Sequence, residues 1–139
     1  MHGSPIDEQL RREVGTLPLR PIVRVTEGAT LREVARAMRE ANVSSALVGH
    51  LPRRIVTERD LTRGLAEGLG PDAPVEEVAE RIPVWVTTTS QVLDVAEMMV
   101  RHQLRHLIVV APRGEEVGIV SMRDVFALFL PEHLAFASA

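Results

Sequence analysis

Two short segments of the chain place a side-chain hydroxyl three residues before a carboxylate, Ile55-Val-Thr-Glu-Arg-Asp60 and Ile119-Val-Ser-Met-Arg-Asp124. A carboxylate can accept hydrogen bonds from a sugar diol, and a hydroxyl can reach a ribose or phosphate oxygen. The apolar residues that begin each segment can form a flat wall for a base. Arg59 and Arg123 add positive charge next to the carboxylates. The pattern therefore indicates a pair of sites for a nucleoside or nucleotide.

The same spacing is also that of a helix capping box, in which the hydroxyl and the acid bind free backbone N–H groups. On this interpretation Thr57, Asp60, Ser121 and Asp124 do no more than start two helices. Both interpretations place the hydroxyls where a strand passes into a helix, and a helix N-terminus also attracts anions. The residues alone leave the two interpretations open.

The two segments belong to an internal repeat. Residues 25–48 reappear 61 positions later, and the later Ile55 and Ile119 segments are 64 positions apart. The three additional residues fall within Pro112–Glu116, where a turn can absorb them. A repeat of this length predicts two similar units that bury their apolar faces against each other and form a cleft along a shared pseudo-two-fold axis.

Each copy is predicted to fold as β-α-β-β-α, which gives an α/β (α+β) fold of tandem repeats. The first copy should contain an extended segment at 21–25, a helix from the Thr30–Glu33 capping box to near Asn42, strands at 45–48 and up to Val56, and a helix over 58–69. The second copy should repeat this with 84–87, 92–102, 107–110, 116–120 and 123–130. Residues 74–82 are predicted to form a short linking helix, and Ile6, Leu10 and Val14 a short N-terminal one.

Composition limits the classes of protein. The 139 residues include no cysteine, so disulfides, thiolate metal sites and cysteine nucleophiles are excluded. No apolar run is long enough to span a bilayer, and no signal segment begins the chain, so a cytoplasmic protein without membrane contact is expected. The net charge of −3 argues against a general nucleic-acid binder.

The repeat plan, its duplication and the apolar–apolar–Thr/Ser–x–x–Asp signature in both copies together resemble the cystathionine β-synthase (CBS) domain pair, or Bateman module. The resemblance covers roughly residues 18–131. It implies an N-terminal extension at 1–17, a first repeat at 18–70, a linker helix and second repeat at 71–131, and a C-terminal tail at 132–139. It also implies a regulatory module that binds AMP, ADP, ATP or S-adenosylmethionine in the cleft between the repeats.

In the family, the signature Asp holds the ribose hydroxyls and the Thr or Ser touches ribose or phosphate, roles that carry over to Asp60, Asp124, Thr57 and Ser121. The resemblance implies that each phosphate arm comes from the opposite repeat and that adenine lies against the first extended segments. The implied residues are Arg105, His106 and Arg123 for the Asp60 site, Ser44, Ser45 and Arg59 for the Asp124 site, and Ile22, Val23, Pro83 and Val84, with Ile55 and Ile119, beside the base.

Two departures from the family pattern predict unequal sites. The family often has a glycine before the signature strand, which lets backbone approach the base; the second copy has Gly118 and the first has Arg54. The second copy also presents Arg105 and His106 where the first presents two serines. One site should therefore favour phosphorylated ligands. Because Arg105 and His106 are the implied phosphate contacts of the Asp60 site, we expect it to be that site.

The sequence offers less support for a metal site or a hydrolytic site. His102 and His106 have a metal-ligand spacing only if one helix holds both, and Ser121 lacks the Gly-x-Ser-x-Gly elbow of a hydrolase. We therefore expect a binding protein without enzymatic activity and without an obligatory cofactor or metal. A homodimer formed through the helices ending at Leu69 and Leu130 is expected, together with a regulated protein partner of unknown identity. The alternatives are a ligand-free dimerisation or docking scaffold and a nucleic-acid-binding module.

Overall fold

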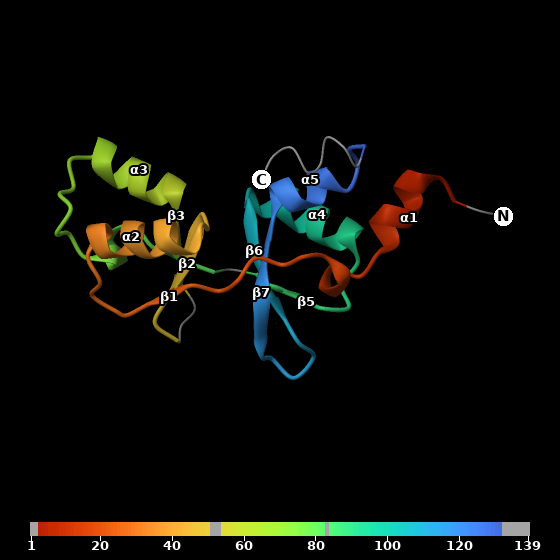
Figure 1. Cartoon of the computed structure of the whole chain (residues 1–139), viewed down its shortest axis with the longest axis horizontal. Helices are drawn as coiled ribbons and strands as arrows, with labels where there is room; N and C mark the ends of the chain where they lie inside the picture. Colours follow the sequence, from red (N-terminus) through yellow and green to blue (C-terminus); the bar gives the residue numbers. More distant parts are fainter. Residues whose placement is uncertain (1–2, 51–53, 83, 132–139) are drawn as a thin grey trace. The chain divides into compact units, whose positions relative to one another are not determined.

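The N-terminal segment, up to Arg20, belongs to the same structural unit as the second repeat. In the computed structural model, which describes residues 3–50, 54–82 and 84–131, the chain forms two units (Figure 1). One unit combines the residues up to Arg20 with those from Val84 onward, and the other comprises Pro21–Pro83. Each repeat therefore has its own core, and the chain passes from one unit to the other after Arg20 and again near residue 83.

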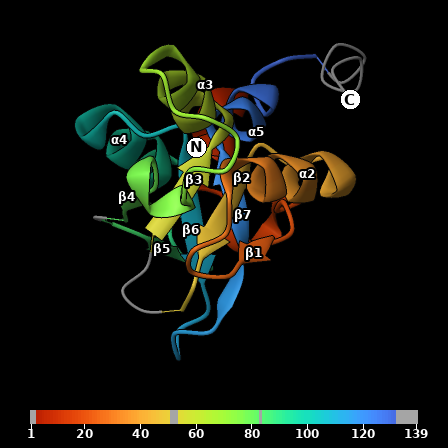
Figure 2. The ribbon, with the colours of Figure 1, turned by 90° about the vertical axis from the view of Figure 1, so that its left-hand side faces the viewer.

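The first-repeat unit is a four-stranded sheet of order β1-β2-β3-β4 that is covered by two helices (Figure 2). Strands β1 and β2 are parallel, and the other pairs are antiparallel. The elements are β1 (Arg24–Val25), α2 (Leu31–Ala41), β2 (Ser45–Val48), β3 (Arg54–Thr57), α3 (Glu58–Ala66) and β4 (Glu80–Arg81).

The second-repeat unit has a three-stranded sheet of order β5-β6-β7, again with one parallel and one antiparallel pair. Its elements are α1 (Pro5–Arg11), a 3-10 turn (Val14–Thr16), β5 (Val86–Thr87), α4 (Val92–His102), β6 (His106–Val110), β7 (Glu116–Ser121) and α5 (Met122–Ala127). The predicted β-α-β-β-α plan is thus confirmed in both copies. The predicted and observed ends of the elements differ by up to three residues.

Local sequence explains where the helices start and stop. Thr30 Oγ1 accepts a hydrogen bond from the Glu33 amide at 3.1 Å, and Glu33 Oε1 accepts one from the Thr30 amide at 3.0 Å, so the predicted capping box is present. At the other end, Asn42 has a left-handed φ of 54° and Gln103, at the equivalent place in α4, has 55°. Such a residue ends a helix because it redirects the backbone.

Each unit buries an apolar core between its helices and one face of its sheet. The first core gathers the helix stripe Leu31, Val34 and Met38 with strand residues such as Val56. The second gathers the equivalent stripe Val92, Val95 and Met99 with strand residues such as Val120. Ala35, the neighbour of Val34 in α2, is exposed and does not belong to this stripe.

The predicted linking helix over 74–82 is wrong. The chain forms a 3-10 turn at Val75–Glu77 and then strand β4, which pairs with β3. Val75 and Val78 are both buried in the first core, a spacing that one 3-10 turn satisfies as well as an α-helix does. Strand β4 then pairs with the open edge of β3. A pattern of apolar residues does not reveal such an edge pairing.

The N-terminal helix is present but shorter than predicted. Helix α1 ends at Arg11, Ile6 is 59% exposed, and Val14 lies fully buried in the second core. The segment after the helix bonds to the second repeat, with Val14 N to Ser90 O at 2.8 Å and Gly15 N to Thr88 O at 2.9 Å. Further along, Arg20 pairs with Ile119 of β7 as an additional antiparallel bridge.

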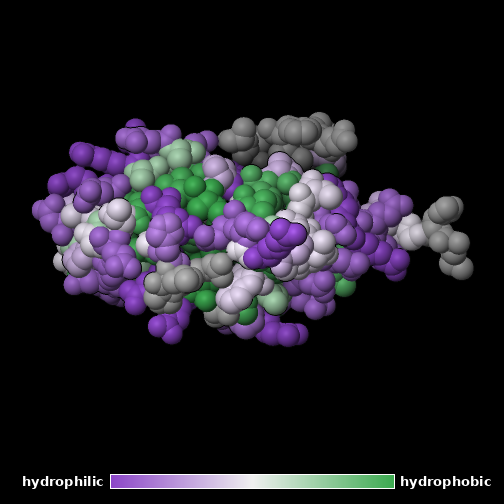
Figure 3. All heavy atoms as spheres, turned by 90° about the horizontal axis from the view of Figure 1, so that it is seen from below, coloured by the Kyte–Doolittle hydropathy of each residue, from purple (hydrophilic) through white to green (hydrophobic). Residues whose placement is uncertain are grey.

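Apolar side chains also reach the surface. In the face shown in Figure 3, apolar surface is bordered by hydrophilic side chains. Within the part of the chain that the structure describes, no helix is long and apolar enough to cross a membrane.

Candidate functional site at two strand-to-helix junctions

The first junction joins β3 to α3 through Thr57 and Asp60. Thr57 Oγ1 accepts a hydrogen bond from the Asp60 amide at 3.2 Å. Asp60 Oδ2 accepts one from the Thr57 amide at 2.8 Å and one from the Thr57 hydroxyl at 3.0 Å. Asp60 is buried. The capping box that the spacing predicts is therefore formed.

The second junction, between β7 and α5, has the same local geometry. Ser121 Oγ accepts from the Asp124 amide at 3.1 Å, and Asp124 Oδ2 accepts from the Ser121 amide at 3.2 Å. Both signature carboxylates thus cap their helices. The capping bonds use Oδ2 of each carboxylate and do not involve Oδ1.

An arginine also binds the carboxylate at both junctions, but the two arginines come from different parts of the chain. Asp124 Oδ1 accepts from Nη2 of Arg20 at 3.0 Å, and its Oδ2 accepts from Nε at 3.3 Å. Asp60 Oδ1 accepts from Nη1 of Arg63, one helical turn away, at 3.2 Å. Arg63 also donates to Glu80 Oε1 at 3.2 Å.

Sequence reasoning missed both arginines. Arg63 lies three residues after Asp60 on a helix, a spacing at which opposite charges attract. The sequence could therefore have predicted this ion pair. Arg20 lies 104 residues before Asp124, and no local pattern links the two.

The arginine contact alters the electrostatics of the second junction. Burial by itself raises the pKa of Asp124, but the hydrogen bonds from Arg20 and Ser121 outweigh it, and the pKa is lowered. The hydrogen bond to Asp124 raises the pKa of Arg20. Asp124 is thus held as a carboxylate at neutral pH, the form that accepts hydrogen bonds from hydroxyl groups.

Each signature carboxylate has a lone-pair position that none of the described residues fills. An ionised carboxylate offers about four lone-pair positions. Asp60 accepts three hydrogen bonds, from Thr57 N, Thr57 Oγ1 and Arg63. Asp124 accepts three, from Ser121 N and twice from Arg20. Among the described residues, Oδ1 of Asp60 and Oδ1 of Asp124 each have a single hydrogen-bond donor, so Oδ1 is the atom that can accept a hydroxyl.

The strands bring the predicted apolar wall next to the hydroxyl. Side chains alternate between the faces of a strand, so Ile55 and Thr57 share one face while Val56 enters the helix-side core. Ile119 and Ser121 share the equivalent face of β7, and Val120 enters the other core. The isoleucine, and not the valine, is the apolar neighbour of the hydroxyl at each junction.

The neighbouring strands place the predicted arm residues beside the hydroxyl of their own repeat. Ser45 pairs with Thr57, and His106 pairs with Ser121. Ser44 and Arg105 precede them and accept, through their carbonyls, from the first helical amides, with O···N distances of 3.1 Å to Glu58 and 2.8 Å to Met122. The side chains of Arg59, Arg105 and Arg123 are exposed.

The predicted base-contacting residues of the extended segments differ in burial. Val23 and Val84 pack against the cores of their own units. Ile22 is half-buried. Pro83 lies outside the described residues, as do residues 51–53 and the tail from 132 onward.

Gly118 has a structural role that the sequence did not reveal. A Cβ atom at this position would lie 2.8 Å from the Leu19 Cβ atom and 3.0 Å from the Arg20 carbonyl oxygen. The glycine therefore lets the N-terminal segment pair closely with β7. In the first repeat, Arg54 takes this place and pairs with Arg81 of β4.

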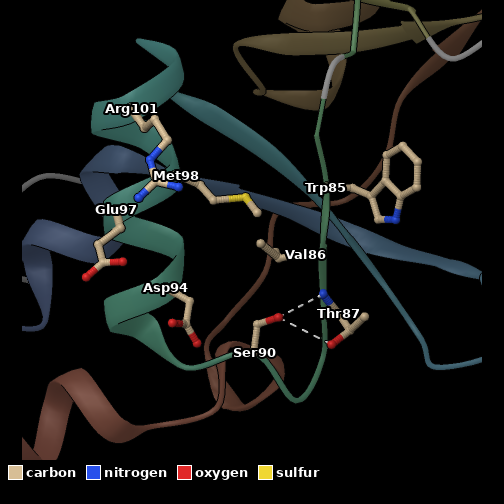
Figure 4. A pocket seen from close by; sticks show the side chains of 8 residues that line it. All are labelled: Trp85, Val86, Thr87, Ser90, Asp94, Glu97, Met98 and Arg101. Carbon is tan, nitrogen blue, oxygen red and sulfur yellow. Dashed lines mark hydrogen bonds between the residues drawn. The ribbon is translucent and has the colours of Figure 1, made fainter.

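A shallow hollow of about 380 Å³ lies elsewhere, between α4 and the edge strand β5 (Figure 4). Its side chains do not include any of the predicted site residues. They are Trp85, Val86, Thr87, Ser90, Asp94, Glu97, Met98 and Arg101. The Trp85 side chain points away from Met98, and the Ser90 hydroxyl is bonded to the Thr87 amide at 3.1 Å. Thr87 and Ser90 are thus engaged with each other, and Asp94 Oδ2 accepts from the Gln91 amide at 3.3 Å.

His102 and His106 do not share a helix, because α4 ends at His102 and β6 begins at His106. Among residues 3–50, 54–82 and 84–131, no group of three His, Asp or Glu side chains is arranged to hold a metal ion.

Comparisons with known proteins agree with the repeat analysis. The family model of the CBS domain matches residues 14–67 and 75–130. An uncharacterised 17.7 kDa protein of Acidianus ambivalens is 33% identical over 112 residues, covering 78% of this chain and 68% of that protein. A CBS domain-containing protein of Arabidopsis thaliana, CBSCBSPB3, is 35% identical over 116 residues; the match covers 80% of this chain but only 21% of the plant protein.

A solved structure with the same fold contains a ligand. The CBS domain protein PAE2072 from Pyrobaculum aerophilum, complexed with AMP, is 35% identical, with a TM-score of 0.74. The alignment covers 92% of this chain and 100% of that one.

Proposed function

The chain belongs to the CBS domain family, and on that premise we propose that it is a regulatory module that binds an adenosyl ligand at its two strand-to-helix junctions. The observation that carries the proposal is that Oδ1 of Asp60 and Oδ1 of Asp124 each accept from only one of the described residues, an arginine, at a junction that also holds an apolar isoleucine. The similarity to a protein complexed with AMP supports the adenosyl class. AMP, ADP, ATP and S-adenosylmethionine are the candidate ligands.

In this proposal each carboxylate accepts a hydrogen bond from a ribose hydroxyl on Oδ1. The hydroxyls of Thr57 and Ser121, at the same junctions, contact the ribose or the phosphate. Ile55 and Ile119 supply the apolar surface against which adenine packs. Arg105, His106 and Arg123, together with Ser44, Ser45 and Arg59, supply the polar contacts to the phosphate or its replacement. Ile22, Val23, Pro83 and Val84 complete the surroundings of the base.

We also propose that the module acts as a homodimer and transmits ligand binding to a protein partner. The rival function is a ligand-free scaffold of the same fold. A ligand that binds only the folded chain raises its melting temperature by mass action, whereas a scaffold is indifferent to adenosyl compounds. A panel of AMP, ADP, ATP, adenosine and S-adenosylmethionine, screened by melting temperature, therefore separates the two functions.

The sharper experiment asks whether the carboxylates bind ribose or only cap their helices. Asn keeps the shape and one acceptor, so Asp60→Asn and Asp124→Asn should each cost about 1 kcal/mol of cap stability or less. A charge-assisted contact to ribose is worth roughly 1.5–3 kcal/mol, so binding should weaken about 10- to 150-fold by titration calorimetry.

Glu33→Gln provides a matched control. Glu33 closes a capping box of the same geometry at the start of α2, but it belongs to neither junction. This variant should melt slightly lower and bind the ligand like the unmodified chain. If the Asp60 and Asp124 variants behave in the same way as Glu33→Gln, their carboxylates are caps alone and the ribose assignment is wrong.

A further inference from the structure

Arg20 and Glu80 occupy the same position in the two units but carry opposite charges. Arg20 pairs with Ile119 of β7, and Glu80 pairs with Ile55 of β3. The two isoleucines are equivalent, because each comes two residues before the hydroxyl of its junction. The edge position beside each junction is thus filled by a guanidinium in one unit and by a carboxylate in the other.

Both edge residues are connected to the signature carboxylate of their unit. Arg20 binds Asp124 directly through two hydrogen bonds. Glu80 binds Arg63 at 3.2 Å, and Arg63 binds Asp60 at 3.2 Å. The Asp124 cluster therefore sums to zero charge, whereas the Asp60 cluster, with two acids and one arginine, sums to −1.

Resting on the proposed function, we propose that Arg20 and Glu80 determine which ligand charge each junction accepts. Arg20 makes the Asp124 junction favour adenosine 5′-phosphates. Glu80 makes the Asp60 junction favour uncharged or cationic adenosyl ligands. The residues expected from the opposite repeat, Arg105, His106 and Arg123, favour phosphate at the Asp60 site. The charges of Arg20 and Glu80 within each unit act against that preference.

The effect is large enough to measure. One elementary charge acting on a phosphate dianion across roughly 8 Å, at an effective dielectric constant of about 60, changes the affinity about ten-fold. Adenosine carries no charge, so its affinity should change little. The ratio of the adenosine and AMP dissociation constants therefore isolates the charge effect from any general loss of the site.

The test measures this ratio by titration calorimetry at low salt, with one junction weakened at a time. In an Asp60→Asn background, where the Asp124 junction dominates binding, Arg20→Gln should lower the preference for AMP about ten-fold. In an Asp124→Asn background, Glu80→Gln should raise the preference for AMP by a similar factor. Both effects should shrink at high salt, because ions screen charges at this separation.

Arg20→Lys is the matched variant, since it keeps the charge but not the two-pronged contact. It should retain the AMP preference if charge is what matters. If Arg20→Gln weakens AMP and adenosine equally, Arg20 only holds Asp124 in place and the inference fails, although ligand binding remains. If the unmodified chain binds neither AMP nor adenosine, it is the proposed function that fails.

Discussion

Arg20 donates to both carboxylate oxygens of Asp124, a residue 104 positions further along the chain. The contact ties the last residue of the N-terminal segment to the second junction. It forms within one structural unit, since Arg20 and the whole second repeat pack together. The stability of this unit should therefore depend on the charge of Asp124.

The first prediction concerns pH. Because the folded pKa of Asp124 is lowered, its contribution to stability is present above the unfolded value of about 3.9 and is lost as the pH falls through the folded value. Asp124→Asn should cost about 1 kcal/mol of unfolding free energy at pH 6. This difference from the unmodified chain should shrink by pH 3 in urea titrations. A difference that stayed constant or grew on acidification would contradict the assignment.

A second prediction tests the close approach at Gly118. Ala at this position would force Leu19 and the Arg20 carbonyl away, so Gly118→Ala should lower the free energy of unfolding by about 1–3 kcal/mol. Gly70→Ala is the control, because a Cβ atom there has no described atom within 4 Å and the backbone φ is not left-handed. That variant should be neutral or slightly stabilised. Equal stability of the two variants would remove the packing role of Gly118.

A third prediction tests whether the N-terminal segment is part of the second core. Val14 is fully buried among second-repeat residues, whereas Ile6 in α1 is 59% exposed. Val14→Ala should cost about 2 kcal/mol in urea unfolding. Ile6→Ala should change the stability by no more than about 0.5 kcal/mol. If both variants unfold like the unmodified chain, the segment does not contribute to that core.

Much of each repeat could be predicted from the sequence because its signals are local. The Thr30–Glu33 capping box, the apolar stripes of α2 and α4 and the two junction boxes all lie within a few residues of chain. Because the chain contains a repeat, the same local pattern occurs twice and supports the same prediction in each copy. The family match and the β-α-β-β-α plan follow from these local signals.

The remaining features depend on residues far apart in the chain. Nothing near Arg20 indicates that it bonds Asp124, and nothing near Glu80 indicates that β4 joins the edge of β3. The family resemblance implies that Gly118 lets the backbone approach the base of the ligand. In the structure the close neighbour of Gly118 is Leu19, in the N-terminal segment. Sequence patterns record which face of an element is buried, but not which distant backbone pairs with its edge.

The last prediction concerns the homodimer and the surface that forms it. The outer side of α4 and α5 exposes apolar side chains, with Val100 76% and Phe126 63% exposed. The equivalent residues of α2 and α3 are Arg39 and Thr62. A two-fold interface places a surface against its own copy, which suits an apolar surface and not an arginine-bearing one.

We therefore expect the second repeats of two chains to pair, giving a dimer mass by light scattering at tens of micromolar protein. Phe126→Arg would place two like charges in that interface and bury them at a high desolvation cost, so this variant should be monomeric. Thr62→Arg introduces the same charge at the equivalent position of the first repeat and should leave the dimer intact. A monomeric unmodified chain, or a Phe126→Arg variant that remained dimeric while Thr62→Arg dissociated, would show that the α4–α5 surface is not the interface.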